Sequence, residues 1–444
     1  MSATPRSTPF RSTLQQHTLG FCLLGAAHTI AQLEAGRSLP RSLAEVFSQM
    51  KAGAQASGAM QDIAYRTARQ LGLVRELLRK MTAHKPEPAL LRALLYCALT
   101  LLVKNTEEMR LPYEPFTLVN QCVNAAASTP FLANTRNLVN AILRRFLREQ
   151  TSLILSATKN TEAMWNYPVW WVNDVRHAYP QDWQTILQAG NSPPPLVIRV
   201  NARKTTTENY LARLREAGMG GTHSEKMAIT LASPVPVTQL PGWQEGLISV
   251  QDASAQLAAY LLDVSDGMSV LDACAAPGGK SCHILETANV NLLAIDSDAD
   301  RLAYIHDNLQ RLQLQATVRQ GDATRKDWWD GRLFDRILAD VPCTASGIVR
   351  RHPDIRWLRK KADLSRLATL SAQIMDNLWQ MLRPGGKLLF VTCSIWPDES
   401  EKRAVSFATK NHAITLPSPG QILPAAKEAH DGLFYALFQK PDTV

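Results

Sequence analysis

Two cysteines follow predicted strands at positions where a thiol could act as a nucleophile. Cys343 comes after the strand-like run DRILAD, in the sequence DVPCTASG, and Cys393 comes directly after GKLLFVT. A single cysteine at such a position is most often a small buried hydrophobic residue. Two of them, one preceded by Asp340 and Pro342, favour a chemical role. Because the thiolate is the reactive form of cysteine, the pair predicts covalent catalysis in surroundings that promote ionisation.

One reaction that needs such a set is substitution at carbon 5 of cytosine, which is a poor nucleophile. A thiolate that adds to carbon 6 makes carbon 5 enamine-like and able to attack a methyl sulfonium. A carboxyl group such as that of Asp340 could stabilise the charge that develops near N3. A base must then remove the proton on carbon 5 before the thiol leaves. Cys343, Cys393 and Asp340 are therefore the candidate catalytic residues.

A glycine turn follows another predicted strand, in the sequence VLDACAAPGGKSCHILE. Glycine lets a backbone approach a ligand closely, and the start of the following helix offers free N–H groups to an anionic group. The turn is shorter than G-x-G-x-x-G, so a cofactor with a carboxylate is favoured over a dinucleotide with a pyrophosphate. The candidate cofactor loop consists of Cys274, Ala275, Ala276, Pro277, Gly278, Gly279 and Lys280.

Two aspartates follow the next two predicted strands. Asp296 comes eighteen residues after Gly278, where an acid can hydrogen-bond ribose hydroxyls, and Asp322 lies in QGDAT, where it could reach an adenine amino group. Either residue alone is weak support, since such aspartates often only cap helices. Together with the glycine turn, the two aspartates at the ends of the next two strands predict a nucleoside cofactor.

Basic residues gather in two places. The run IVRRHPDIRWLRKK after Cys343 is either a solvated basic helix or a grip on an RNA backbone, and its position beside the candidate site favours the grip. The helix NLVNAILRRFLRE offers the same choice for Arg144, Arg145 and Arg148. The net charge of +9 favours a polyanionic partner. The candidate RNA contacts are Arg144, Arg145, Arg350, Arg351, His352 and Arg356.

Three regions must position these residues. Residues 1–150 are nearly all helical in pattern, with a buried segment around LLRALLYCALTLLV, and predict a helical bundle. Residues 151–245 contain a tryptophan cluster, the strand pattern LVIRVN and a helix from about Thr207 to Ala217, which predict a small α+β domain. Residues 246–444 alternate strand and helix, as in a mainly parallel sheet with helices on both faces. The strands expected there are MSVLDA, NLLAID, ATVRQ, DRILAD, GKLLFVT and GLFYALF.

The composition excludes several classes of protein. Seven cysteines without a CxxC pair argue against a zinc site or a disulfide framework, so we expect no metal and a reducing, cytoplasmic environment. The longest apolar stretch, residues 93–103, is too short to cross a bilayer, so we expect no membrane partner.

The motifs DACAAPGGKSCHILE, DRILADVPCTASGIVRRHPDIRW and VTCSIWPDESE resemble those of the RNA cytosine-5 methyltransferases. The resemblance is closest to the bacterial enzymes of the small-subunit ribosomal RNA, covers nearly the whole chain, and extends to ISVQDASAQ and DGLFYALF. NLVNAILRRF is similar to the closing helix of a NusB-like RNA-binding domain. Val341 and Ala273 depart from the usual motifs, and neither change removes a reactive group.

The resemblance implies a Rossmann-like class I methyltransferase domain (α/β), preceded by a small ferredoxin-like α+β domain and an all-α NusB-like domain. It implies S-adenosylmethionine as cofactor and 16S ribosomal RNA as substrate, and we expect a monomer that does not act on DNA. Cys393 would be the nucleophile, and Cys343 would assist product release. The cofactor contacts would be Cys274 to Lys280, Asp296, Asp322 and Asp340, and Asp340 would also contact the target base.

Three other functions remain to be distinguished. A DNA cytosine methyltransferase would use Cys343 as the nucleophile and would not need Cys393. A non-enzymatic RNA-binding or assembly factor would be expected to lose a nucleophile or the glycine turn, and this chain retains both. A nicotinamide dehydrogenase is disfavoured by the short glycine turn.

Overall fold

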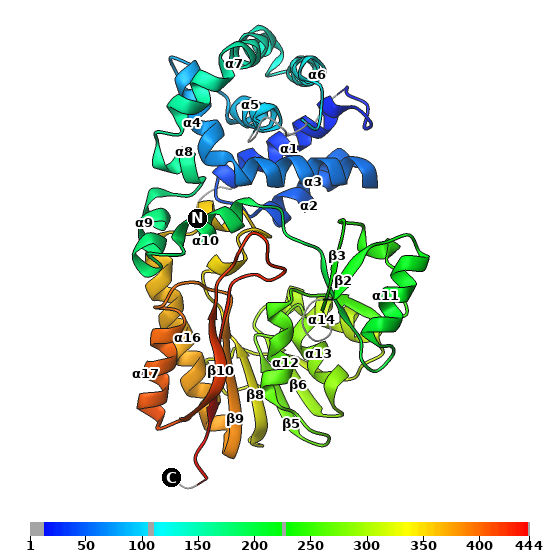
Figure 1. The fold of residues 1–444 in the computed structure, drawn as a ribbon, viewed down its shortest axis with the longest axis vertical. Helices are drawn as coiled ribbons and strands as arrows, with labels where there is room; N and C mark the ends of the chain where they lie inside the picture. Colours follow the sequence, from blue (N-terminus) through cyan, green and yellow to red (C-terminus); the bar gives the residue numbers. More distant parts are fainter. Residues whose placement is uncertain (1–12, 105–110, 224–227, 443–444) are drawn as a thin grey trace. The chain divides into compact units, whose positions relative to one another are not determined.

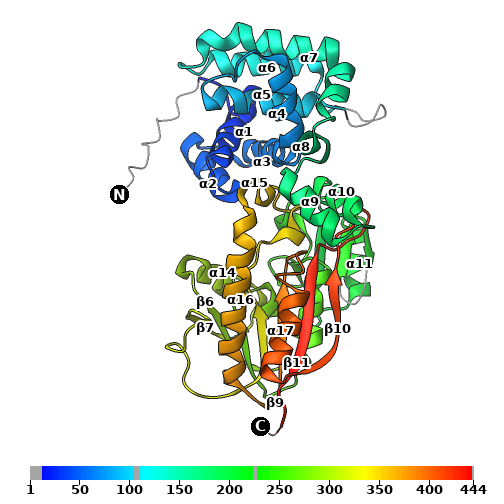
Figure 2. The ribbon, with the colours of Figure 1, turned by 90° about the vertical axis from the view of Figure 1, so that its left-hand side faces the viewer.

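The computed structural model describes residues 13–104, 111–223 and 228–442, which form two compact units (Figures 1 and 2). The first unit contains the chain up to His177 together with the segment His352–Arg359. The second contains Ala178–Arg351 and the chain from Lys360 onward. The boundary differs from the expected one at residue 150, which falls inside the helix Arg136–Ala157.

The first unit is a bundle of helices, as its apolar pattern predicts. The central helix α5 (Ala89–Leu102) is buried at every position from Leu90 to Leu102. It contacts helices on all sides because it has no polar face to keep in water. The other helices of this unit are α1 (Leu19–Glu34), α2 (Leu39–Met50), α3 (Ala54–Arg69), α4 (Leu71–Met81), α6 (Pro115–Ala127), α7 (Arg136–Ala157), α8 (Thr161–Trp165) and α9 (Val169–Ala178).

The segment His352–Arg359 completes this bundle although it lies far along the chain. Its short helix α15 (Ile355–Leu358) is preceded by Asp354, whose carboxylate accepts a hydrogen bond of 2.9 Å from the Leu39 backbone N–H. The Trp357 indole N–H donates to the Ala68 carbonyl at 2.7 Å. These bonds satisfy groups at the start of α2 and the end of α3, so the segment is a structural part of the helical unit.

The second unit begins with α10 (Trp183–Asn191) and an antiparallel sheet of order β2-β3-β1-β4. The predicted strand LVIRVN forms β1 (Val197–Val200), and the predicted helix forms α11 (Thr207–Glu216), whose N-cap Thr206 accepts from the Asn209 N–H. The other strands are β2 (Gly221–His223), β3 (Ala228–Leu231) and β4 (Ile248–Val250). Strand β4 lies beyond the expected boundary at 245.

The rest of this unit is a seven-stranded sheet of order β10-β11-β9-β8-β5-β6-β7. Strands β7, β6, β5, β8 and β9 are parallel, and β11 and β10 are antiparallel to their neighbours. This is the expected α/β fold of a Rossmann-like methyltransferase. The strands are β5 (Ser269–Ala273), β6 (Asn291–Asp296), β7 (Thr317–Gln320), β8 (Phe334–Asp340), β9 (Leu382–Thr392), β10 (Ile414–Ile422) and β11 (Leu433–Gln439).

Helices cover both faces of the sheet because the strands are apolar on both sides (Figures 1 and 2). Val270, Leu338 and Leu389 face α12 (Leu257–Leu262), α13 (Gly279–Thr287) and α14 (Ala299–Leu312). The neighbouring residues Leu271, Ile337 and Leu388 face α16 (Lys361–Met381) and α17 (Glu401–Asn411). The carboxyl ends of β5, β6, β8 and β9 therefore share one edge of the sheet, where the loops that follow them carry the candidate site.

Candidate active site

The two candidate cysteines meet at this edge. Strands β8 and β9 are paired with Asp340 opposite Val391, so the loops that leave them start side by side. The Sγ atoms of Cys343 and Cys393 lie 3.4 Å apart. Cys343 is 8% exposed, whereas Cys393 is only partly buried. Of the two thiols, Cys393 is the one more accessible to a substrate.

The surroundings of Cys343 keep it protonated. The hydrogen bond with Cys393, followed by burial and by the negative charges of Cys393 and Glu399, raises the pKa of the Cys343 thiol well above its ordinary value. A thiol held in the protonated form is a poor nucleophile. The geometry therefore divides the pair into an accessible thiol and a buried proton-bearing one.

A buried glutamate, which the sequence did not reveal as a site residue, joins the loops that carry both cysteines. Glu399 is 1% exposed and accepts hydrogen bonds from the Thr344 N–H at 2.9 Å and the Thr344 hydroxyl at 2.5 Å. It also accepts a bond of 2.6 Å from the Ser394 hydroxyl. Thr344 and Ser394 directly follow Cys343 and Cys393, so Glu399 fixes the position of the two thiols. The acids in PDESE gave no sign of this role because their contacts depend on the fold.

Lys280 and Asp340 form an ion pair beside the thiols. The Lys280 Nζ lies 2.6 Å from the Asp340 Oδ2. Burial lowers the pKa of Lys280, but the charge of Asp340 and the hydrogen bond with it outweigh burial, so the pKa is raised overall. The negative charge of Cys393 also acts to raise the pKa of Lys280. The sequence analysis assigned Lys280 to the cofactor loop alone, and the structure brings it to the candidate catalytic residues as well.

The candidate cofactor loop turns sharply between β5 and α13. Gly278 has φ of +96°, and a Cβ there would approach the Ile305 Cα at 3.1 Å, so the turn requires glycine. At Gly279 a Cβ would meet only Gln251 Nε2 at 4.0 Å, so this side of the loop is open. Gly278 caps α13 without a side-chain hydrogen bond. The first N–H groups of the helix are therefore available to a ligand.

An unpaired buried oxygen lies next to this loop. Asp272, near the end of β5, is 1% exposed and uses Oδ2 to accept a hydrogen bond from Ser281. Its Oδ1 has no hydrogen-bond partner among the described residues. Burial raises the pKa of Asp272 to about 7, with the Ser281 hydrogen bond acting against it. A buried acceptor without a partner fits a ligand that donates a hydrogen bond.

Asp296 contacts the cofactor loop. It is 4% exposed, and its Oδ2 accepts a hydrogen bond of 3.0 Å from the Ala276 N–H. Arg301, which the sequence analysis did not identify, donates to the Ala276 carbonyl at 2.5 Å and lies 3.7 Å from Asp296. Asp322 is exposed and accepts a hydrogen bond of 2.9 Å from the Thr324 N–H, so its side chain takes part in a local turn. No contact joins Asp322 to the loop among the described residues.

Two arginines of the basic run after Cys343, Arg350 and Arg351, are held in ion pairs, which corrects the expectation that they contact RNA. Arg350 is 1% exposed and is paired with Asp431 at 2.6 Å. Arg351 lies 2.8 Å from Asp252 and also pairs with Asp431. Guanidinium groups held in buried ion pairs cannot bind phosphates without breaking those pairs.

The remaining predicted contacts of this run lie in the segment that completes the helical unit. Arg356 is fully buried, with its guanidinium carbon 3.8 Å from the centre of the Tyr167 ring and a hydrogen bond of 3.2 Å to the Asn166 carbonyl. His352 is partly buried at the start of the same segment. Arg356 therefore contributes to packing, and it is not an RNA contact.

On α7 the two predicted arginines differ. Arg145 pairs with Glu149 at 3.0 Å and donates to the Met81 carbonyl at 3.1 Å. Arg144 is exposed and donates to the Asn140 side chain at 3.0 Å. Of the two, Arg144 is the one whose guanidinium is not bound to a carboxylate within the described ranges.

Two structural findings limit other kinds of site. In the ranges that the structure describes, no group of three or more His, Cys, Asp or Glu side chains is placed to hold a metal ion. Nor do the helices of those ranges include one with the length and apolar character needed to span a bilayer. All seven cysteines are free thiols.

Comparison with known families gives two matches. The model of a family described as 16S rRNA methyltransferase RsmB/F matches residues 259–439. The model of the ferredoxin-like domain of RsmF/B-like methyltransferases matches residues 167–238. Together they cover the cofactor loop, both cysteines and most of the antiparallel sheet.

Similar proteins extend the likeness to nearly the whole chain. The ribosomal RNA small subunit methyltransferase B of Pasteurella multocida is 40% identical over 94% of this chain and 95% of its own length. The protein of the same name from Vibrio cholerae is 39% identical over 95% of this chain and 99% of its own length. The crystal structure of PH0851 has a TM-score of 0.77 at 22% identity, covering 97% of this chain and 100% of that one, and shares its fold.

Proposed function

We propose that this chain, which belongs to the family of ribosomal RNA small subunit methyltransferase B, methylates carbon 5 of a cytidine in 16S ribosomal RNA. The chain is an S-adenosylmethionine-dependent ribosomal RNA methyltransferase. The choice of carbon 5 rests on one observation, the contact between the Cys343 and Cys393 thiols beside Asp340 and Lys280. Methyl transfer to an oxygen or to an exocyclic nitrogen needs no thiol pair.

The residues of the cofactor loop fit S-adenosylmethionine. The N–H groups at the start of α13 would bind its carboxylate, and the free Oδ1 of Asp272 would accept from its ammonium group. Asp296 would accept from the ribose hydroxyls, and Asp322 would reach the adenine. When bound, S-adenosylmethionine supplies an electrophilic methyl sulfonium.

Cys393 is the proposed nucleophile. Its thiolate would add to carbon 6 of the cytosine, which forms a C–S bond and moves electron density toward carbon 5 and N3. Of the two thiols Cys393 is the more accessible, whereas Cys343 is buried and keeps its proton. Asp340, held by Lys280 at 2.6 Å, would accept a hydrogen bond from N3 once this nitrogen is protonated, and would so stabilise the adduct.

Cys343 is proposed to act after methyl transfer. Carbon 5 then carries both the methyl group and a proton, and that proton must leave as the C–S bond breaks and the double bond re-forms. Cys343 lies 3.4 Å from the sulfur of the departing Cys393, so its thiol proton would pass to that leaving sulfur. The Cys343 thiolate formed in this way would then accept the proton from carbon 5, which returns both cysteines to thiols. Glu399 would hold both loops in place during these steps.

The test is methyl transfer by the purified protein to 16S RNA from cells that lack the corresponding gene. We expect label from S-adenosylmethionine to appear as 5-methylcytidine in digested nucleosides, and one cytidine to resist bisulfite conversion. Cys393→Ala is the control and should transfer nothing. Label in N4- or N3-methylcytidine would overturn carbon 5 as the target, and transfer to DNA with Cys343 as the sole required thiol would place the chain in the DNA class. Light scattering of the active protein checks the expected monomer.

A further inference from the structure

The excess positive charge of the chain lies in its helical part. Residues 1–177 contain 20 lysines and arginines against 11 aspartates and glutamates, which accounts for the whole net charge of +9. Residues 178–444 contain 28 of each sign. The unit that carries neither cysteine of the candidate active site is therefore the one that attracts a polyanion most strongly.

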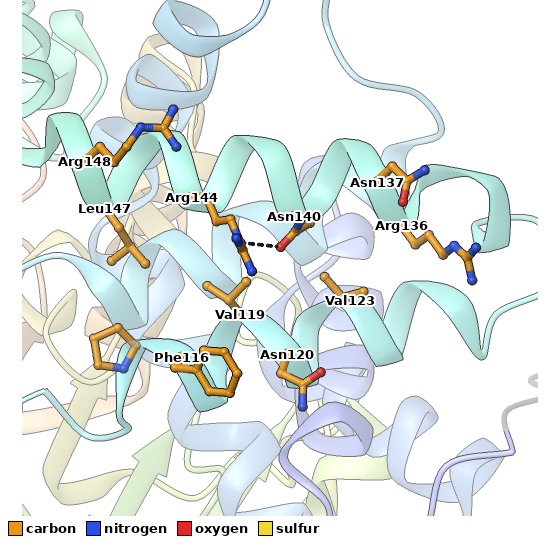
Figure 3. A pocket seen from close by; sticks show the side chains of 11 residues that line it. Phe116, Val119, Asn120, Val123, Arg136, Asn137, Asn140, Arg144, Leu147 and Arg148 are labelled. Carbon is orange, nitrogen blue, oxygen red and sulfur yellow. Dashed lines mark hydrogen bonds between the residues drawn. The ribbon is translucent and has the colours of Figure 1, made fainter.

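Within the helical unit, α6 and α7 enclose a groove with a volume of about 940 Å³ (Figure 3). The spacing of the residues explains it. Positions 140, 144, 147 and 148 follow one face of α7, and 116, 119, 120 and 123 follow one face of α6, at intervals of three and four residues. We call this the α6–α7 groove, and its polar or exposed lining residues include Phe116, Asn120, Arg136, Asn140, Arg144 and Arg148.

The lining of the groove suits a nucleic acid strand. Arg136, Arg144 and Arg148 line it, whereas no aspartate or glutamate does among the described residues. The arginines form no ion pair with a carboxylate in the described part of the chain. They span about 18 Å along α7 at a rise of about 1.5 Å per residue. A row of guanidinium groups of this length can contact several phosphates.

The floor and the opposite wall add groups that recognise bases. Val119 and Leu147 give the groove an apolar floor, and Asn120 and Asn140 offer amide donors and acceptors. Phe116 is 76% exposed on α6, so its ring is free to stack (Figure 3). Aromatic rings of this kind stack on the unpaired bases of single strands, which duplex RNA does not expose.

We propose that the α6–α7 groove binds a single-stranded segment of the ribosomal RNA substrate, separate from the nucleotide that is methylated. The proposal rests on the proposed function for the identity of the RNA. A protein partner also could use exposed Phe and Arg side chains, but a wall of arginines without acids favours a phosphate backbone. The groove thus supplies affinity for the substrate and takes no part in the chemistry.

The test compares full-length variants by fluorescence anisotropy with a labelled single-stranded oligoribonucleotide and with its duplex. We expect Arg144→Ala/Arg148→Ala to weaken single-strand binding and to lower the slope of log K against log salt by about 1.4, at about 0.7 per lost phosphate contact. Phe116→Ala should weaken binding at least about fivefold, and Phe116→Trp should restore it. Arg41→Ala, an exposed arginine on α2, is the matched control and should have a smaller effect.

Methylation assays separate this proposal from the proposed function. The groove variants should raise KM for RNA and leave kcat and S-adenosylmethionine affinity unchanged. If the groove variants bound RNA with unchanged affinity, the groove would not be an RNA-binding site, even if the wild-type protein methylates RNA normally. Loss of activity only on protein-containing particles, with normal binding of naked RNA, would identify a protein as the occupant and overturn the proposal. Loss of RNA binding in a protein that methylates no RNA would support the groove while refuting the proposed function.

Discussion

The Sγ atoms of Cys343 and Cys393 lie 3.4 Å apart although the residues are 50 positions apart in the chain. The parallel pairing of β8 with β9 brings them together, and the buried Glu399 carboxylate fixes the loops that carry them. Two thiols at this distance do not ionise together, since each charge opposes the other. One thiol therefore acts first, and the other retains its proton for a later step.

The two cysteines should fail in different ways when replaced. Cys393→Ser is expected to abolish both methyl transfer and any covalent adduct, since a serine hydroxyl is far less ionised than a thiol near neutral pH. Cys343→Ser should still permit addition and methyl transfer but block release. The enzyme would then accumulate as a protein–RNA complex, visible as a slow band on a denaturing gel that nuclease removes.

The double variant is the control for this assignment and should show no slow band, because the adduct needs Cys393. A band with Cys393→Ser and none with Cys343→Ser would exchange the two roles. Retained methylation without an adduct in either single variant would rule out covalent catalysis.

Asp296 should determine cofactor affinity. Its carboxylate supports the loop through the Ala276 N–H and would accept from the ribose. Removing an acceptor of charge-assisted hydrogen bonds costs about 1.5–3 kcal/mol, so Asp296→Ala should weaken S-adenosylmethionine binding by about tenfold or more in calorimetry. Asp296→Asn keeps an oxygen that can accept from the Ala276 N–H, so it should lose less affinity for S-adenosylmethionine than Asp296→Ala does. Equal affinity in all three proteins would remove Asp296 from the site.

Arg199 and Glu286 should form a stabilising pair between β1 and the cofactor helix α13. The two side chains are buried, with N–O distances of 2.9 and 2.7 Å, and Arg199 also donates to the Gly279 carbonyl at 3.0 Å. Breaking a buried pair costs about 3–5 kcal/mol, so Arg199→Ala should lower the free energy of unfolding by this amount in urea. The double variant Arg199→Ala/Glu286→Ala should lose less free energy of unfolding than the sum of the losses in the two single variants. Losses that add fully would show that the pair is not coupled.

Asp272 should make stability depend on pH. Burial raises its pKa to about 7 in the folded protein, whereas the unfolded chain titrates near about 3.9. Between these values the unfolded state loses its proton first, so this carboxyl lowers stability as pH rises from about 4 to 7. Asp272→Asn should remove that decline, by up to about 4 kcal/mol at pH 7. Asp307→Asn, an exposed carboxyl on α14, is the control, and identical pH profiles of both variants would refute the prediction.

The sheet and the catalytic edge followed from the sequence because local pattern determines them. Six apolar runs in the last region form strands, and the residues that follow the five parallel strands among them lie at one edge. Strand β10 was not predicted, since Pro417 and Pro419 interrupt its pattern, and an edge strand tolerates proline because one side needs no partner.

The misassigned arginines show what local pattern cannot supply. Arg350 and Arg351 have the same spacing as residues of a solvated basic helix, yet their partner Asp431 lies 80 or more positions away. The role of Glu399 is not predicted for the same reason, since its hydrogen bonds with Thr344 and Ser394 exist only in the folded protein. Charge and periodicity predict which residues can ionise or face inward, whereas the partners of a buried charge come from tertiary structure.

The placement of His352–Arg359 in the helical unit has a consequence for synthesis of the chain. The Asp354 carboxylate caps the Leu39 N–H across 315 positions of sequence, so the bundle cannot be completed when its own helices leave the ribosome. At about 5–20 residues per second, the chain between His177 and Arg359 takes about 10–40 s to translate. During that interval the nascent bundle exposes the surfaces that Trp357 and Arg356 later cover. Co-translational folding of the two units is thereby linked, and the first unit matures only after much of the second has been made.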